Sequence, residues 1–279
     1  MRTSVVRPGP GTPMLVGFGT VGGAMGALLG GGTGLISVPV LDKFTTLRRV
    51  SVHGTATMPN FAVAVVGSLA YWLRGGSIYL DAGIPLMVGG VAGALFGVRV
   101  VNRAPEWALR AVFIAVLVVA GVKLLLDAAH ADPLERGAVL PDSVRGNLAA
   151  VIAIGLACGI VIGAWEAAMG LGGGLLTVPI LVLLFGVGLH TAEGTSLLVM
   201  LPNALAGAVA HTRQQTASVP FGLRLAAGAA AGAVLGAVLA LSLDETVLGY
   251  VFGVFVLAMA AREATRARRA GRAQRPHRR

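Results

Sequence analysis

Residues 30–41 read GGGTGLISVPVL and residues 170–181 read GLGGGLLTVPIL, so almost the same stretch occurs twice, 140 positions apart. In both copies glycines precede a hydroxyl residue, a valine and a proline. Glycine adopts backbone conformations that are closed to other residues, and proline lacks the N–H that a helix interior uses. Each copy therefore predicts a helix that stops, turns sharply and restarts, with Pro39 and Pro179 as helix-breaking residues.

The composition indicates a protein that lies in a membrane. The 279 residues are 56% hydrophobic and only 12% charged, and the mean hydropathy is +0.82. Apolar runs at 106–127, 219–243 and 246–261 approach or exceed the roughly 20 residues that a helix needs to cross a bilayer. We therefore expect an all-α polytopic membrane protein. A soluble helix bundle is the alternative, but too few polar residues remain to cover its surface.

The formal net charge of +10 would suit a nucleic-acid partner, but its location favours a membrane. Eight arginines lie in 262–279, beyond the last apolar run. A basic tail after a membrane helix is typical of a cytoplasmic flank held near anionic lipid. Its low complexity predicts disorder. We expect membrane lipid as a partner, and no nucleic acid.

Several soluble-protein motifs are excluded by their context. The single cysteine, Cys158, allows neither an intrachain disulfide nor a cysteine metal cluster, and we expect no metal and no cofactor. Gly17–Gly22 fits the dinucleotide pattern G-x-G-x-x-G, but no alternating strand and helix unit surrounds it. The N-terminus resembles a signal peptide. Because residues 14–30 have a counterpart in the second half, we expect them to remain part of the fold.

The repeat extends over two halves with one plan. Gly54-Thr55-Ala56 corresponds to Gly194-Thr195-Ser196, and Met58-Pro59-Asn60 to Leu201-Pro202-Asn203 after a slip of three residues. Each half is predicted to have a Gly-rich apolar segment, a short segment with the proline, and three longer helices. The predicted segments are 14–30, 33–47, 54–73, 80–101 and 106–127, then 147–170, 174–188, 193–211, 219–241 and 245–262. The chain thus divides into an N-terminal cytoplasmic segment 1–13, a first membrane repeat 14–127, a linker 128–146, a second repeat 147–262 and a basic cytoplasmic tail 263–279.

The positions of lysine and arginine indicate how each half is oriented. An odd number of crossings per half puts most of these residues on the same side as the C-terminal tail, which the positive-inside rule favours. The two halves are then inverted repeats, and both termini lie in the cytoplasm of a bacterial-type plasma membrane. The glycine hairpins either span the membrane fully or dip in and return.

The two hairpin tips are the candidate binding site. A break within the membrane exposes N–H groups where the second arm starts, and these groups and the helix dipole favour an anion. Irregular backbone survives in hydrocarbon only where it is buried in protein or faces water, and inverted tips meet near the midplane. The alternative is that the glycines merely permit tight packing. The candidate tip residues are Gly32, Thr33, Gly34, Gly172, Gly173 and Gly174.

Polar residues at the start of the next helix extend this site. Hydroxyl and amide groups donate to an oxyanion without fixing it by charge, which suits a site that must release its ligand. Helix capping is an equal alternative for Thr55 and Thr195. The polar residues in this region are His53, Thr55, Thr57 and Asn60 in the first half and Glu193, Thr195, Ser196 and Asn203 in the second. Among them, the binding candidates are Thr55, Asn60, Thr195, Ser196 and Asn203.

Glu166 stands alone in the apolar run GIVIGAWEAAMG at 159–170. An ionisable residue inside a membrane helix is costly and is a functional candidate by default. We interpret Glu166 as a carrier of a coupling proton, or else as a residue beside a water-filled cavity. Gly89, Gly93 and Gly97, like Gly228, Gly232 and Gly236, place small residues on one helix face, which we interpret as close helix packing.

The duplicated motif, seen most clearly in Gly170–Leu181, and the Gly-Thr segment that follows each copy resemble the TauE/SafE family, also called the 4-toluene sulfonate uptake permease family. The resemblance covers roughly 14–127 and 147–262, and the first copy departs from the motif with Thr33 in place of the glycine at 173. It implies a secondary transporter of sulfite, sulfonates or related sulfur-containing organic anions, coupled to a proton or another ion. It also implies that the glycine tips, Thr55, Asn60, Thr195, Ser196 and Asn203 line the permeation path, and that the chain is not an enzyme.

Two other classes of function remain as alternatives. A membrane-embedded enzyme would need His, Asp, Glu or Ser clustered at one membrane face, and the sequence shows no such cluster at convincing spacing. A scaffold subunit would have no permeation path. The leading hypothesis is therefore alternating access of a small anionic substrate at a midplane site between the two repeats.

Overall fold

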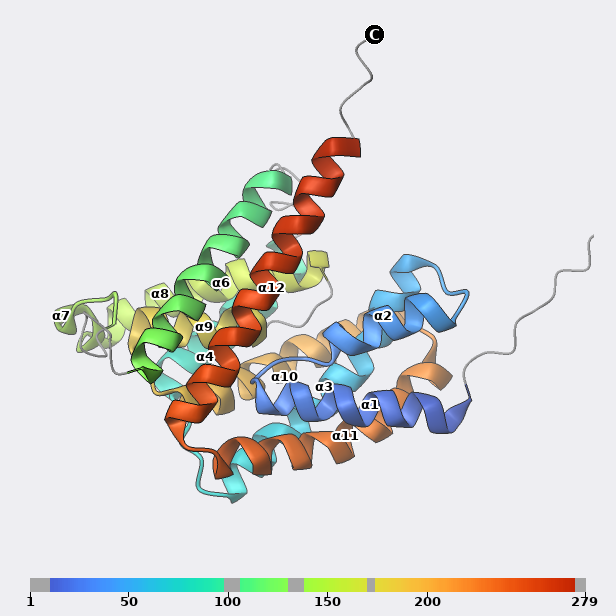
Figure 1. Ribbon diagram of the computed structural model, residues 1–279, viewed down its shortest axis with the longest axis horizontal. Coiled ribbons are helices and arrows are strands. Elements are labelled where there is room, and N and C mark those ends of the chain that lie inside the picture. The colour runs from blue at the N-terminus through green and yellow to red at the C-terminus, as the bar shows by residue number, and fades with distance from the viewer. Residues whose placement is uncertain (1–10, 98–105, 130–137, 170–173, 274–279) are drawn as a thin grey trace, which may run out of the picture.

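The computed structural model describes residues 11–97, 106–129, 138–169 and 174–273, and every regular element in these ranges is a helix (Figure 1). The expected all-α membrane fold is confirmed. The first half holds α1 (Thr12–Leu28), α2 (Gly34–Phe44), α3 (Arg49–Leu73), α4 (Leu80–Ala92) with the π-helical turn η1 (Gly93–Gly97), and α6 (Glu106–Ala128). The second half holds the short α7 (Asp142–Arg145), α8 (Leu148–Met169), α9 (Gly174–Phe185), α10 (Leu189–Arg213), α11 (Val219–Ser242) and α12 (Glu245–Ala273).

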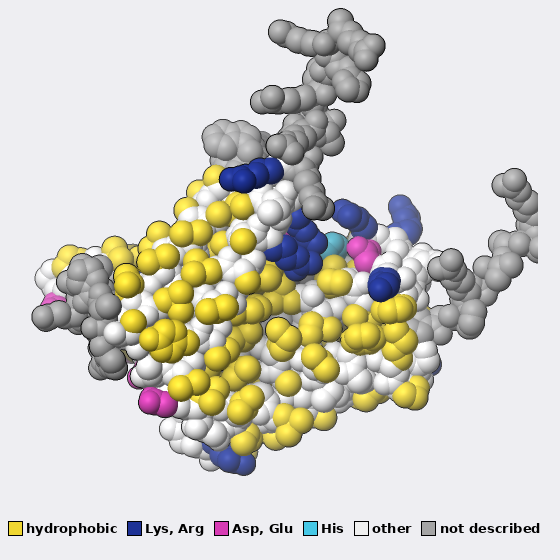
Figure 2. Space-filling view, viewed as in Figure 1, with side chains coloured by type: hydrophobic (Ala, Val, Ile, Leu, Met, Phe, Trp, Pro, Cys, Tyr) yellow, Lys and Arg dark blue, Asp and Glu magenta, His cyan; other side chains and the backbone are white. Residues whose placement is uncertain are grey.

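The outer surface is suited to lipid. Within the described ranges, six helices are long and apolar enough to cross a membrane, while α1, α4 and α9 are apolar but shorter. Figure 2 shows a face largely covered by hydrophobic side chains, with Lys and Arg gathered at its upper edge. Exposed apolar residues on the paired helices α6 and α12 include Val119, Val122, Val251 and Val254. An apolar surface of this kind marks a region that water does not cover in the functional protein.

The basic tail begins as a continuation of the last span. Low complexity predicts disorder after residue 262, whereas α12 runs without interruption to Ala273. This stretch is rich in alanine and arginine, which are both strong helix formers, so an existing helix extends readily into it. The last residues, 274–279, lie outside the described part of the chain.

The chain reverses at glycines and not at prolines. Gly30, between α1 and α2, has a φ of +57°, a conformation that glycine adopts without strain. The predicted breaks at Pro39 and Pro179 differ from the structure, because α2 and α9 continue through them. Each proline is the sixth residue of its helix, so the N–H that it lacks would pair only with the carbonyl of the second residue. The loss of one hydrogen bond so near the helix start does not end the helix.

The two halves exchange packing partners. Helix α1 lies along α11, and its repeat counterpart α8 lies along α4 and η1. Helix α3 packs against α10, and α6 packs against α12, so these two pairs join equivalent elements of the two halves. Such reciprocal contacts are what a two-fold relation between the halves produces. Their inversion relative to a membrane stays a prediction.

Glycines allow the exchanged helices to touch backbone to backbone. A Cβ added at Gly228 would lie 2.0 Å from the carbonyl oxygen of Val16 on α1, and one at Gly93 would lie 2.1 Å from that of Ile160 on α8. No side chain fits in such a space. The packing role predicted for these glycine ladders is confirmed at both interfaces, and it explains why small residues recur every fourth position.

We predict that Gly232→Ala destabilises the protein by about 1–3 kcal/mol, because its Cβ would lie 2.0 Å from the carbonyl oxygen of Thr20 and would force α1 and α11 apart. Thermal unfolding in detergent measures the change. Gly17→Ala is the matched control, since a Cβ there meets nothing within 4 Å. Equal unfolding temperatures for the two variants would contradict the packing argument.

Candidate functional site

The tip of the first glycine hairpin contacts the start of α9 inside the protein. A Cβ added at Gly174, the first residue of α9, would lie 2.2 Å from the Gly30 carbonyl oxygen and 2.3 Å from the Gly31 Cα. The starts of α2 and α9 therefore point into one region, as the sequence predicts. Gly172 and Gly173 lie outside the described residues.

Asn60 of α3 holds the first tip. Its Oδ1 accepts hydrogen bonds from the Thr33 N–H at 2.7 Å and from the Thr33 hydroxyl at 2.9 Å. The Ser37 hydroxyl donates in turn to Thr33 Oγ1 at 2.9 Å. A Cβ at Gly32 would lie 2.8 Å from the same Asn60 oxygen, so the tip backbone runs directly against the amide. The sequence candidates Gly32, Thr33 and Asn60, with Gly34 as the first residue of α2, thus form one buried cluster.

The second half also binds the first tip. The Ser196 hydroxyl on α10 donates to the Gly30 carbonyl oxygen at 2.6 Å, across 166 residues of sequence. This bond satisfies a carbonyl that the turn leaves outside regular helix, and it links the halves at the candidate site. The structure therefore places Ser196 beside the first-half tip residues.

Asn203 occupies a position different from that of Asn60. Helices α3 and α10 both have 25 residues and start 140 positions apart, so the three-residue slip in the sequence match reflects no insertion within them. Asn203 lies about one helical turn further from its helix start than Asn60 does. Its Nδ2 donates to Glu166 Oε2 of α8 at 3.4 Å, while its buried Oδ1 has no hydrogen-bond partner among the described residues. Asn203 and Glu166 are thus neighbours, which the sequence did not predict.

Thr55 and Thr195 connect the halves in equivalent ways. The Thr55 Oγ1 donates to Ser51 O at 2.6 Å and accepts from the N–H of Ser218, which precedes α11, at 2.9 Å. The Thr195 Oγ1 donates to the carbonyl of Thr191 at 2.6 Å and accepts from the N–H of Tyr79, which precedes α4, at 2.9 Å. Each hydroxyl has one hydrogen to donate, and each gives it to its own helix.

The structure is closed around the first tip. The cavity beside Gly32, Thr33 and Leu175 has a volume of about 10 Å³. That is close to the least space that one water molecule needs. An anion would reach the tips only after the surrounding helices separate.

Two titratable pairs lie at equivalent positions at the two ends of the α3 and α10 helices. Tyr71 donates its hydroxyl to Glu193 Oε2 at 2.7 Å, and both side chains are fully buried. The equivalent residues are His211 and His53, which are partly exposed, and a Cβ added at Gly54, next to His53, would lie 2.8 Å from His211 Nδ1. The sequence signal for this arrangement is that His53 and Glu193 both precede a Gly-Thr pair, 140 residues apart. In the structure, each of these two side chains has a buried atom without a hydrogen-bond partner among the described residues.

Comparison with known proteins identifies the family. The family described as sulfite exporter TauE/SafE matches residues 2–124 and 151–279, which are most of the chain. The chain belongs to this family. The probable membrane transporter protein YunE of Bacillus subtilis (strain 168) is 24% identical over 230 residues, which cover 77% of this chain and 84% of YunE. No solved structure matches the chain.

This TauE/SafE protein is a multi-pass membrane transporter of the permease type, and the two matched segments fall on its two halves.

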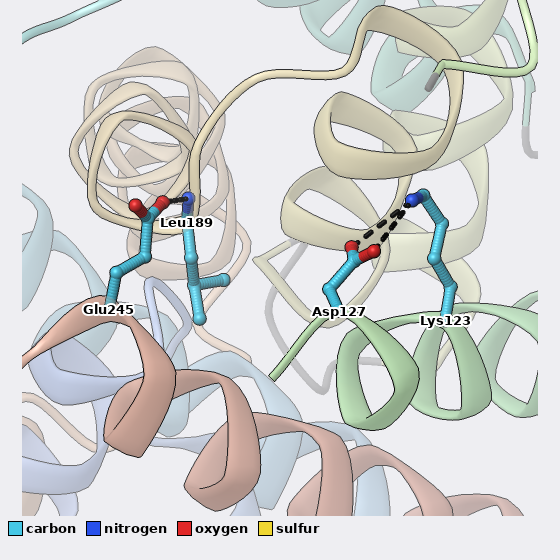
Figure 3. A network of polar contacts seen from close by, with 4 residues as sticks. All are labelled: Lys123, Asp127, Leu189 and Glu245. Atoms are coloured by element: carbon cyan, nitrogen blue, oxygen red, sulfur yellow. Dashed lines mark hydrogen bonds and ion pairs between the residues drawn. The ribbon is translucent and has the colours of Figure 1, made fainter. Parts of the chain in front are cut away.

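A second polar network lies at the end of α6 and the starts of α10 and α12 (Figure 3). Glu245 accepts a hydrogen bond from the Leu189 N–H at 2.8 Å, and Lys123 pairs with Asp127 at 3.1 Å. These groups line a cavity of about 200 Å³, far larger than the one at the tip. This cavity lies beside the start of α10 and not at the tip.

We predict that Asn60→Leu destabilises the TauE/SafE fold by about 1–3 kcal/mol, because the buried Thr33 N–H and hydroxyl both lose their acceptor. Thr33→Val is the matched control, since it removes the bonds of the Thr33 hydroxyl to Asn60 and Ser37 and leaves the N–H paired. Thermal unfolding in detergent measures both variants. The interpretation of Asn60 as the holder of the tip fails if Asn60→Leu is no less stable than Thr33→Val.

Proposed function

We propose that the protein is a secondary transporter of small anions, and that sulfite, sulfonates or related sulfur-containing organic anions are its substrates. The contact between the first glycine tip and the start of α9 is the observation that carries this proposal. The first N–H groups of a helix have no partner within it, so the starts of α2 and α9 offer donors for an oxyanion. The family description supplies the sulfur chemistry.

In this proposal the anion binds where the tips meet, near the midplane, and the two repeats open alternately to either side. Asn60 and Asn203, together with the tip glycines 32, 34 and 172–174, provide neutral donors that hold and release it. Thr33 and Ser196 join them when their hydroxyls release Asn60 Oδ1 and the Gly30 carbonyl. Thr55 and Thr195 frame this path, because each fixes the start of a helix from the opposite half. The closed cavity at the first tip fits a conformation between the two open ones. We also propose that the protein lies in the plasma membrane with both termini in the cytoplasm.

The test is uptake of labelled anions into proteoliposomes, with sulfite, thiosulfate, sulfonates and carboxylates compared. We expect sulfur oxyanions to cross, and Asn203→Leu to lower their flux about tenfold through loss of hydrogen bonds worth about 1–1.5 kcal/mol. Thr212→Ala, an exposed change on the same helix, is the control. Chemical turnover without flux would favour an enzyme, and unchanged flux in Asn203→Leu would favour a scaffold or a different site.

Glu166 is the residue beside this site that we propose carries a coupling proton, because its carboxylate lies next to Asn203. Glu166→Gln keeps the size and the acceptor oxygen but cannot ionise. We expect the variant to show a weaker dependence of flux on pH than the wild type, measured in the same vesicles between about pH 5 and pH 8. An unchanged pH profile would remove Glu166 from the mechanism.

A further inference from the structure

Glu193 is a fully buried acid that the proposed anion site does not use. Its side chain is 0% exposed, its Oε2 accepts the Tyr71 hydroxyl, and its Oε1 has no hydrogen-bond partner among the described residues. A buried ionised carboxylate is costly unless a cation or several donors compensate it. One neutral donor and one unpaired oxygen suit a carboxylic acid that holds a proton.

Among the described residues, the elements packed around the start of α10 bring no cation to Glu193, and Lys123 of α6, which lines the nearby cavity, pairs with Asp127 at 3.1 Å. Among the hydrogen bonds and ion pairs of the described residues, none joins Glu193 to a lysine, arginine or histidine. The described parts of α1 and α9 contain no titratable side chain. The other elements around the start of α10 carry a few titratable or charged groups. These are Tyr71 on α3, the exposed Asp81 on α4, His190 on α10, Glu245 on α12 and, further along α11, Arg224. His190 Nε2 contacts Ala240 O at 3.0 Å instead.

Glu193 lies between the cavity beside Glu245 and the first tip. Leu189, whose N–H binds Glu245 at the cavity (Figure 3), precedes Glu193 by one helical turn, or about 6 Å along α10. On the other side, a Cβ at Gly30 would lie 2.8 Å from the Glu193 Cα, and Ser196 binds that same tip glycine. Glu193 therefore lies next to both the cavity and the contact between the halves.

We infer that Glu193 binds a proton during the transport cycle, that water in the cavity beside Glu245 delivers it, and that Tyr71 positions the carboxyl group. This inference rests on the proposed function for its place in a cycle. When the cavity connects with Glu193, an O–H bond forms at Oε1 and water gives up a proton. When the opposite side opens, that bond breaks and water there takes the proton. The proton crosses with the anion and offsets one of its negative charges.

The first experiment measures anion accumulation in proteoliposomes with acid on the substrate side and the membrane potential clamped at zero. A gradient of one pH unit should drive about tenfold accumulation of a monovalent anion by the wild type, since one unit is tenfold in proton activity. Glu193→Gln should show none, and its anion exchange should depend less on pH than that of the wild type. Tyr71→Phe should shift that dependence. Glu263→Gln, another buried acid, paired with Arg266 at 3.1 Å, should accumulate as the wild type does. Full accumulation by Glu193→Gln would overturn the inference.

The second experiment does not require transport. Infrared spectra of the purified full-length protein at neutral pH should contain the carbonyl band of a protonated carboxylic acid. That band should be missing in Glu193→Gln and present in Glu263→Gln and Glu166→Gln. The same band in Glu193→Gln would overturn the inference, even for a variant that transports nothing. A wild type that exchanges no anion would count against the proposed function, whereas the infrared band tests proton binding by Glu193 independently.

Discussion

The fold depends on one constraint: hydrocarbon offers no hydrogen bonds to a peptide group that leaves a helix. The turn at Gly30 and Gly31 breaks the helix inside the molecule, so its polar groups must find partners in protein. Asn60 and Ser196 supply them, one from each half. Because both partners lie on the helices that follow the hairpins, the irregular tip and the contact between the repeats stabilise each other. A site for a polar ligand is what remains once these helices separate.

The exchange of helices between the halves limits how the protein can move. With α1 against α11 and α8 against α4, the closest backbone contacts lie between the halves and not within them. The sequence halves therefore cannot rock as two rigid bodies without breaking these glycine interfaces. The units that can move intact each combine elements of both halves, one around α1 and α11 and the other around α4 and α8. Thr55 and Thr195, each of which binds a helix start in the opposite half, lie within this exchange.

The sequence predicts the membrane class, the segment order and the role of the glycine ladders, because composition and repeat spacing directly reflect burial in lipid and close packing. It does not predict that α2 and α9 continue through Pro39 and Pro179, since a proline near a helix start costs only one bond. Partner exchange is also hidden, because a repeat pattern says which segments are alike and not which ones touch. Glu193 is visible in the sequence, but only coordinates show that it is sealed against Tyr71 while the more conspicuous Glu166 lies partly exposed beside Asn203.

The proposed alternating access needs two conformations of similar energy, and inverted repeats would provide them because exchanging the roles of the two halves converts one into the other. With identical halves, the two would be equally populated. Here the equivalent pairs differ: Tyr71 and Glu193 are sealed at one end, whereas His211 and His53 are partly exposed at the other. A difference of about 1.4 kcal/mol between the conformations is enough for a tenfold bias. In the proposed cycle, these two pairs occupy equivalent positions but differ in their chemistry. Binding of a proton at one pair is therefore sufficient to favour the conformation in which one end of the protein is closed.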